Sequence, residues 1–259
     1  MGWLSGIIGG GIGAMIAGPF GAIIGAAIGA SMGGTKGIRT GGMGGHLGAF
    51  GESQRLQMLF FTAAFSMVGK LAQADGRVCE NEIAAIRRIS NDILGLDQQT
   101  RRYAIEILNQ SKVSSESFSD YAREFGRVFS GQRDLSMFMM DFLFQVAMAD
   151  GVLHPEEERM LLEAKEHFRL NESVYRTLYT RHVGHRSTSS TGLKQHYQVL
   201  GVAEDANLAE IKKAYRTKAA EYHPDKIQSK GLPPEFLKFA NDKLVEINAA
   251  YEAIMAAKK

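Results

Sequence analysis

The sequence predicts an all-α protein with an N-terminal transmembrane helix, a central helical bundle and a small C-terminal helical hairpin. Three observations lead to this prediction. Residues 3–35 contain no charged side chain. In residues 52–182 and 194–259, apolar residues recur at three- and four-residue spacing, the period of an amphipathic helix. Glycine is concentrated at the front, with 18 of the 29 glycines in the first 50 residues, so this part differs in kind from the rest.

The composition excludes several classes of protein. The 259 residues are 45% hydrophobic and 22% charged, which is ordinary for a globular protein. The net charge of +2 argues against a strongly basic nucleic-acid-binding protein, so no nucleic-acid partner is expected. Cys79 is the single cysteine, which excludes an intramolecular disulfide and a cysteine-rich zinc site. No P-loop, dinucleotide-binding fingerprint or nucleophile motif is present, so we expect neither an enzyme nor a cofactor.

Residues 1–35 are predicted to form the transmembrane segment. The apolar run is longer than the ~20 residues that a helix needs to cross a bilayer. Lys36 and Arg39 follow the run and no basic residue precedes it, which places the rest of the chain in the cytoplasm. A cleaved signal peptide normally begins with basic residues and fits less well. Whether Gly18-Pro19 kinks one span or turns a hairpin stays open, and residues 36–51 are a glycine-rich tether.

Small residues recur every fourth position within this segment. Gly21, Gly25 and Gly29 fall on one face of a helix. Small side chains allow two helices to approach closely in lipid, where apolar surface alone gives no reason to associate. The stripe predicts a homodimer formed through the transmembrane segment.

The middle of the chain, residues 52–182, is predicted to be a bundle of about seven helices. Residues 183–193, rich in serine, threonine and glycine, are a linker to the last domain. His154-Pro155-Glu156 is interpreted as a helix start, because proline is favoured in the first turn. The predicted breaks between helices lie near Gly76, Gly95, Ser111–Ser117, Gly131, Gly151 and Leu170-Asn171.

Two similar Asp-Gly turns occur in this middle domain. AQADGRV at residues 72–78 and AMADGVL at residues 147–153 are each followed by acidic residues. The favoured interpretation is a pair of capped turns, since glycine ends helices and acids favour helix N-termini. The alternative is a divalent-metal site with Asp75 and Asp150 as candidate ligands, although neither loop has the EF-hand pattern. The paired turns resemble the TerB family of tellurite resistance proteins. This resemblance implies a compact helical bundle and, for some members, metal binding.

The C-terminal domain, residues 194–259, is predicted to contain three helices. A short apolar helix from Gln195 ends at Gly201. Asn207 caps a basic helix over residues 208–222, and Pro224 stops it. A third helix with one apolar stripe covers about residues 235–256. Lys218 falls on the apolar side of the second helix, where its stem can pack while its amine reaches water.

Four sequence blocks in this domain occur in a characteristic order. They are YQVLGV at 197–202, EIKKAYR at 210–216, YHPDK at 222–226 and INAAYE at 247–252. Together they resemble the J domain of DnaJ-type co-chaperones, which bind Hsp70 and stimulate its ATP hydrolysis. The resemblance implies that His223, Pro224 and Asp225 form the HPD triplet. The same resemblance implies a surrounding Hsp70-binding surface made of Lys212, Tyr215, Arg216 and Lys226.

The order of the three parts resembles that of membrane-anchored DnaJ-like co-chaperones. This resemblance implies a bacterial inner-membrane protein with a single span, cytoplasmic C-terminal domains, a DnaK-type Hsp70 partner and dimerisation through the span. The rival hypothesis is a membrane-bound metal or envelope-stress sensor that works through the TerB-like domain. Its support in the sequence is limited to the two acid-rich Asp-Gly turns.

Overall fold

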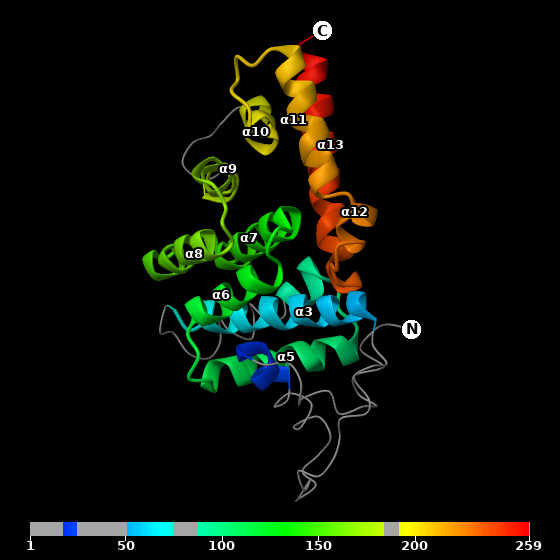
Figure 1. The fold of residues 1–259 in the computed structure, drawn as a ribbon. Helices are drawn as coiled ribbons and strands as arrows, with labels where there is room; N and C mark the ends of the chain where they lie inside the picture. Colours follow the sequence, from blue (N-terminus) through cyan, green and yellow to red (C-terminus); the bar gives the residue numbers. More distant parts are fainter. Residues whose placement is uncertain (1–17, 25–50, 75–87, 184–191, 259) are drawn as a thin grey trace, which may run out of the picture.

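A computed structural model describes residues 18–24, 51–74, 88–183 and 192–258 (Figure 1). Every regular element in these ranges is helical, which confirms the predicted all-α class. Within the same ranges, no helix is both long enough and apolar enough to cross a bilayer.

The helical domain is built around helix α3, Glu52–Leu71. Residues 58–69 of this helix are all buried, because α5, α6 and α7 surround it. A helix that is apolar all round in this way forms the centre of a bundle rather than one of its outer faces. The other elements of the domain are the π-helical η2, Arg88–Ile93, and helices α5, Gln98–Val113; α6, Phe118–Val128; α7, Arg133–Ala147; α8, Pro155–His167; and α9, Glu172–Val183.

Local rules explain where these helices end. Gly95, Gly131 and Gly151 have positive φ values of 64°, 81° and 87°, a conformation that glycine adopts without steric cost. All three are positions of predicted breaks. The described helix boundaries also confirm the breaks predicted around residues 111–117 and 170–171. The break predicted near Gly76 and the first Asp-Gly turn lie outside the described residues.

The C-terminal domain has the three predicted helices in order, and two short helical elements lie in the stretch after Pro224 that was predicted to be a loop. Its elements are α10, Gly192–Leu200; α11, Leu208–Glu221; α12, Pro224–Gln228; the 3-10 turn η4, Pro234–Phe236; and α13, Leu237–Ala257. The Asn207 side chain accepts hydrogen bonds from the backbone N–H groups of Ala209 and Glu210, which starts α11 as predicted. Helix α11 ends at Glu221, just before the proline-containing triplet.

Residues 19–24, within the predicted transmembrane segment, form a helical turn against α6. The Phe20 ring stacks on Tyr121 with 6.1 Å between centroids, and Phe20, Ile23 and Ile24 are buried. Gly21 is buried there too, whereas Gly25 and Gly29 lie outside the described residues. The continuous span over residues 1–35 and its glycine stripe therefore stay predictions.

The two domains pack directly on each other. Helix α10 lies beside α9. At the other end of the hairpin, α12 and the first turns of α13 approach α3 and α7 (Figure 1). Phe236 is fully buried at this contact, with its ring centroid 5.2 Å from that of Phe60 and 5.1 Å from that of Phe142. Burying one such side chain stabilises a contact by about 1.5–3 kcal/mol. The helical domain therefore holds the hairpin in one orientation.

Candidate functional site

His223, Pro224 and Asp225 lie at the corner between α11 and α12. His223 is the residue before α12, and Pro224 occupies the first position of that helix. The backbone N–H of Ile227 donates to the His223 carbonyl at 3.1 Å, which fixes the turn. His223 and Asp225 are exposed, and neither side chain forms a hydrogen bond or ion pair with another described residue. The corner thus presents an imidazole and a carboxylate that are free to meet a partner.

The basic face of α11 is next to this corner. Lys212 and Arg216 are exposed and one turn apart, and the Arg216 Nε donates to the Lys212 carbonyl at 3.3 Å. Two cations on a rigid helix form a surface that attracts an acidic partner and fixes its register. The structure therefore places two of the predicted binding residues, Lys212 and Arg216, on solvent.

Tyr215, another predicted binding residue, is half-buried inside the hairpin. Its ring stacks on Tyr251 with 4.1 Å between centroids, and its hydroxyl donates to Asn248 Oδ1 at 3.1 Å. This contact joins the sequence block at 210–216 to the block at 247–252. Much of the Tyr215 side chain consequently holds α11 against α13, and the remainder is available at the surface.

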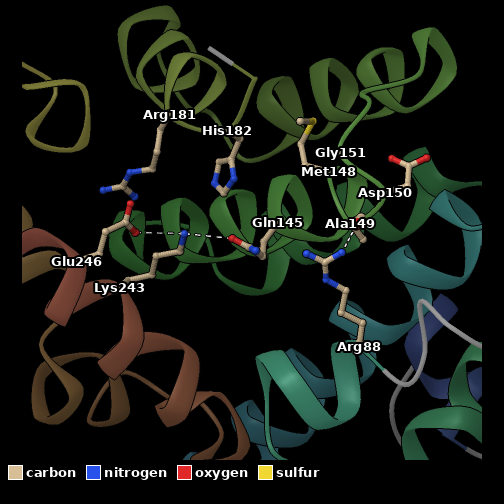
Figure 2. A pocket seen from close by; sticks show the side chains of 10 residues that line it. All are labelled: Arg88, Gln145, Met148, Ala149, Asp150, Gly151, Arg181, His182, Lys243 and Glu246. Atoms are coloured by element: carbon tan, nitrogen blue, oxygen red, sulfur yellow. Dashed lines mark hydrogen bonds and ion pairs between the residues drawn. The ribbon is translucent and has the colours of Figure 1, made fainter. Parts of the chain in front are cut away.

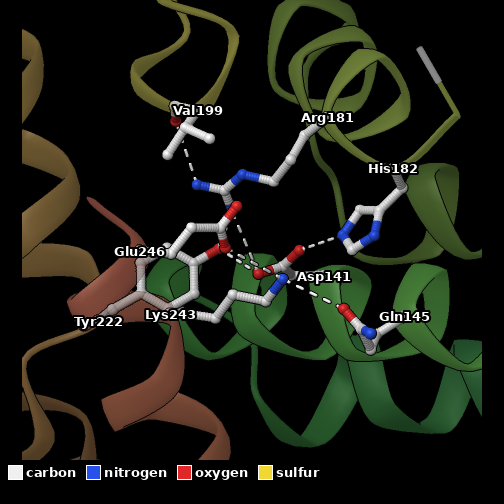
Figure 3. Close-up of polar contacts among 8 residues, drawn as sticks. All are labelled: Asp141, Gln145, Arg181, His182, Val199, Tyr222, Lys243 and Glu246. Atoms are coloured by element: carbon white, nitrogen blue, oxygen red, sulfur yellow. Dashed lines mark hydrogen bonds and ion pairs between the residues drawn. The ribbon is translucent and has the colours of Figure 1, made fainter. Parts of the chain in front are cut away.

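Tyr222, which directly precedes the triplet, is anchored in the helical domain (Figure 3). Its hydroxyl donates to Asp141 Oδ2 at 2.7 Å, and Asp141 is fully buried on α7. The same carboxylate accepts from Arg181 Nη1 at 3.4 Å and from His182 Nε2 at 2.5 Å. Arg181 Nη2 also donates to the Val199 carbonyl at 3.2 Å. This buried polar network connects α7 and α9 to the hairpin and sets the position of the triplet.

The charges in the network determine its protonation state. Burial by itself raises the pKa of Asp141, but Lys243, Arg181 and His182 outweigh burial and hold that pKa well below its usual value. Burial lowers the pKa of His182, and the hydrogen bond to Asp141 offsets only part of this effect. At neutral pH the network therefore contains an ionised Asp141 and a neutral His182 that donates its Nε2 proton. Lys243 Nζ donates to Gln145 Oε1 at 3.2 Å (Figure 3).

A groove of about 340 Å³ separates α11 from α9. Lys218 lines it and is half-buried beside Gly201, so the predicted packing of its stem is confirmed. Burial, and next the charge of Arg181, lower the pKa of Lys218 to about 8. One side of α11 therefore faces the helical domain, and the side with Lys212 and Arg216 remains open.

Lys226 follows the triplet and forms an ion pair with the helical domain. Its Nζ lies 3.0 Å from Asp134 Oδ2, at the start of α7. Lys230 Nζ lies 2.5 Å from the same oxygen. One carboxylate is thus shared by two lysines, one of which is a predicted Hsp70-binding residue.

The second Asp-Gly turn is a capped turn. Asp150 Oδ1 accepts from the Val152 backbone N–H at 2.9 Å, and Asp150 Oδ2 lies 3.4 Å from His154 Nε2. Among the described residues, no three His, Cys, Asp or Glu side chains are grouped so that they can hold a metal ion. Asp75, the other candidate ligand, lies outside the described residues.

A polar cavity of about 450 Å³ lies between Asp150 and the buried network (Figure 2). Its wall includes the basic side chains of Arg88, Arg181 and Lys243 and the acidic side chains of Asp150 and Glu246. Arg88 Nη1 donates a hydrogen bond to the Ala149 carbonyl. Because charges of both signs line it, the cavity favours neither an anion nor a cation.

Sequence reasoning missed the residues that connect the two domains. Asp134, Asp141 and Arg181 had no assigned role, although Asp141 stands on the apolar stripe of α7. A single acidic residue on such a stripe is a signal of a buried ion pair, because an unpaired charge is too costly to bury. The partners of Asp141 are Arg181, 40 residues later, and Tyr222, 81 residues later, and no spacing rule connects these positions.

Comparisons with known proteins agree with this two-domain arrangement. Residues 61–179 match the family of the tellurite resistance protein TerB, and residues 195–259 match the DnaJ domain. The chain is 32% identical over 236 residues to the co-chaperone protein DjlA of Photobacterium profundum, covering 83% of this chain and 85% of that one. It is 32% identical to DjlA of Aliivibrio fischeri (82% of each chain) and 31% identical to DjlA of Vibrio cholerae (83% of each chain). No solved structure matches the chain.

Proposed function

The chain belongs to the family of DjlA co-chaperones, and from this premise we propose that it binds a DnaK-type Hsp70 and stimulates its ATPase. A J-domain co-chaperone regulates an Hsp70 partner rather than acting as an enzyme itself. In the proposed complex, His223, Pro224 and Asp225 contact the Hsp70 together with Lys226. The basic residues Lys212 and Arg216 guide the approach.

The observation that carries this proposal is the exposure of the triplet on an anchored corner. Neither the His223 nor the Asp225 side chain has a hydrogen-bond or ion-pair partner in the described part of the chain, while Tyr222, one position earlier, is anchored by Asp141. A rigidly presented pair of polar groups loses little conformational entropy on binding. The geometry therefore supports a role in contacting a partner rather than in stabilising the fold.

The basic face of α11 provides a direct test of this role. We expect that Lys212→Ala and Arg216→Ala each raise the concentration needed for half-maximal stimulation of Hsp70 about two- to fivefold, which is the range for an exposed ion pair. The effect should shrink at high salt, because salt screens exposed charges. The measurement is single-turnover ATP hydrolysis by a purified DnaK-type Hsp70. Lys194→Ala, at an exposed lysine on α10, is the control that should change nothing. Equal effects from all three variants would mean that α11 has no special role.

We also propose that residues 1–35 anchor the protein in a bacterial inner membrane with its C-terminal domains in the cytoplasm. The absence of charge over residues 3–35 and the basic residues Lys36 and Arg39 support this topology. It places the J domain where Hsp70 and ATP are found. In the proposed anchored state residues 19–24 lie in the bilayer instead of against α6, and Gly21, Gly25 and Gly29 form the face for homodimer formation there.

Gly25 is the residue to change in a test of this dimer. We expect that Gly25→Ile weakens the signal of a two-hybrid reporter of membrane-helix pairing to background, because a branched side chain separates the two backbones. Insertion should be unaffected, so protease added to sealed spheroplasts should spare residues 52–259 in both proteins. Ala27→Ile, on the opposite face of the helix, is the matched control. An unchanged signal for Gly25→Ile would exclude the stripe as the dimer contact.

A further inference from the structure

The ion pairs of Asp134 connect the helical domain to the binding surface of the J domain. Asp134 lies at the start of α7, and its side chain is 17% exposed. Lys226 and Lys230 approach the same oxygen, Oδ2, at 3.0 Å and 2.5 Å. Burial by itself raises the pKa of Asp134, but the hydrogen bonds from these two lysines lower it below its usual value. The carboxylate is therefore ionised at neutral pH.

We propose that Asp134 competes with the Hsp70 for Lys226, so that the helical domain restrains its own J domain. This inference rests on the proposed function, because it assigns a regulator to the same binding surface. An acidic group of the Hsp70 and the carboxylate of Asp134 are chemically equivalent partners for one ammonium group. While Lys226 is paired with Asp134, its charge is neutralised towards an acidic partner.

Lys230 makes this exchange physically feasible. A partly buried carboxylate that loses its only cation pays a desolvation cost without compensation. Asp134 avoids this cost, because Lys230 remains in contact when Lys226 turns towards the Hsp70. Lys226 is 43% exposed, so it can reach a partner without unfolding of α12. The buried Phe236 and the Tyr222–Asp141 bond keep Asp134 next to the loop during the exchange.

The proposal predicts opposite effects for a variant of Asp134 and a variant of Lys230. Asp134→Asn should free Lys226 and lower the concentration of the full chain needed for half-maximal stimulation of Hsp70 about two- to fivefold. Lys230→Gln should raise that concentration by a similar factor, because Asp134 then has Lys226 as its main partner. If Lys230 acts through Asp134, the double variant should behave as Asp134→Asn alone.

The test uses full chains with single-turnover ATP hydrolysis by a purified DnaK-type Hsp70. Glu166→Gln is the matched control, since it removes one exposed acidic charge from α8, a helix that packs against α6 and α7. If Asp134 merely orders the loop, both single variants should weaken stimulation, and that result would overturn the proposal. Equal half-maximal concentrations for wild type and Asp134→Asn would overturn it too. Failure of the wild-type chain to stimulate any Hsp70 is a different result, which would reject the proposed function itself.

Discussion

We expect that His223→Gln reduces stimulation of Hsp70 ATPase to the unstimulated rate while the protein keeps its fold. The side chain is exposed and forms no hydrogen bond or ion pair with other described residues, so nothing in the described fold depends on it. Exposed substitutions of this kind change the free energy of unfolding by about 0.5 kcal/mol or less. Any loss of stimulation therefore reflects contact with the partner. The measurements are single-turnover ATP hydrolysis and a thermal melt of the full chain.

The helical domain offers a matched control for this variant. His154 also precedes a proline at the first position of a helix, α8, but the helical domain has no sequence block of the J-domain type. We expect His154→Gln to leave stimulation unchanged. Wild-type stimulation by His223→Gln would reject the J-domain mechanism, and equal losses from both histidine variants would show a general effect of the substitution.

The second large effect is expected at Asp141. Asp141→Asn keeps the size of the side chain and removes the charge that Arg181 and Lys243 face. Removing one partner of a buried ion pair costs about 3–5 kcal/mol, because the remaining charge is left uncompensated. We therefore expect a decrease of this size in the free energy of unfolding, measured by urea denaturation of the full chain.

Two further variants make the Asp141 result interpretable. Tyr222→Phe removes one hydrogen bond to the carboxylate and should cost about 1.5–3 kcal/mol, so it remains measurable if Asp141→Asn does not fold. Asp150→Asn is the control, because this exposed carboxylate caps a turn and asparagine caps almost as well. A loss below about 1 kcal/mol in Asp141→Asn would mean that the network contributes little to stability.

The pH dependence of stability provides an independent check of the network. The pKa of Asp141 is lowered in the fold, so its stabilisation is present above the unfolded pKa of about 3.9 and is lost as pH falls through the folded value. The pKa of His182 is also lowered, so the unfolded chain takes up a proton first and stability decreases as pH falls below about 6.5. The difference in the free energy of unfolding between wild type and Asp141→Asn should therefore become smaller below about pH 4.

Local rules made much of the J domain predictable. The cap at Asn207, the end of α10 at Gly201 and the stop before Pro224 depend on residues a few positions apart, and all are confirmed. The candidate site residues were assigned through the family resemblance instead, and they all lie within the continuous stretch 212–226. Lys212, Arg216, His223 and Asp225 are exposed as the family resemblance implied.

The sequence by itself determined the long helices, many of their boundaries and the order of the domains, because capping, proline stereochemistry and helical periodicity act over short distances. Only the tertiary structure decided how the triplet is held. Asp141 and Tyr222 are 81 residues apart, and Asp134 and Lys230 are 96 apart, on opposite sides of the linker. Such contacts arise when two folded domains pack, and the pairing of a buried carboxylate then depends on three-dimensional complementarity that no local pattern records.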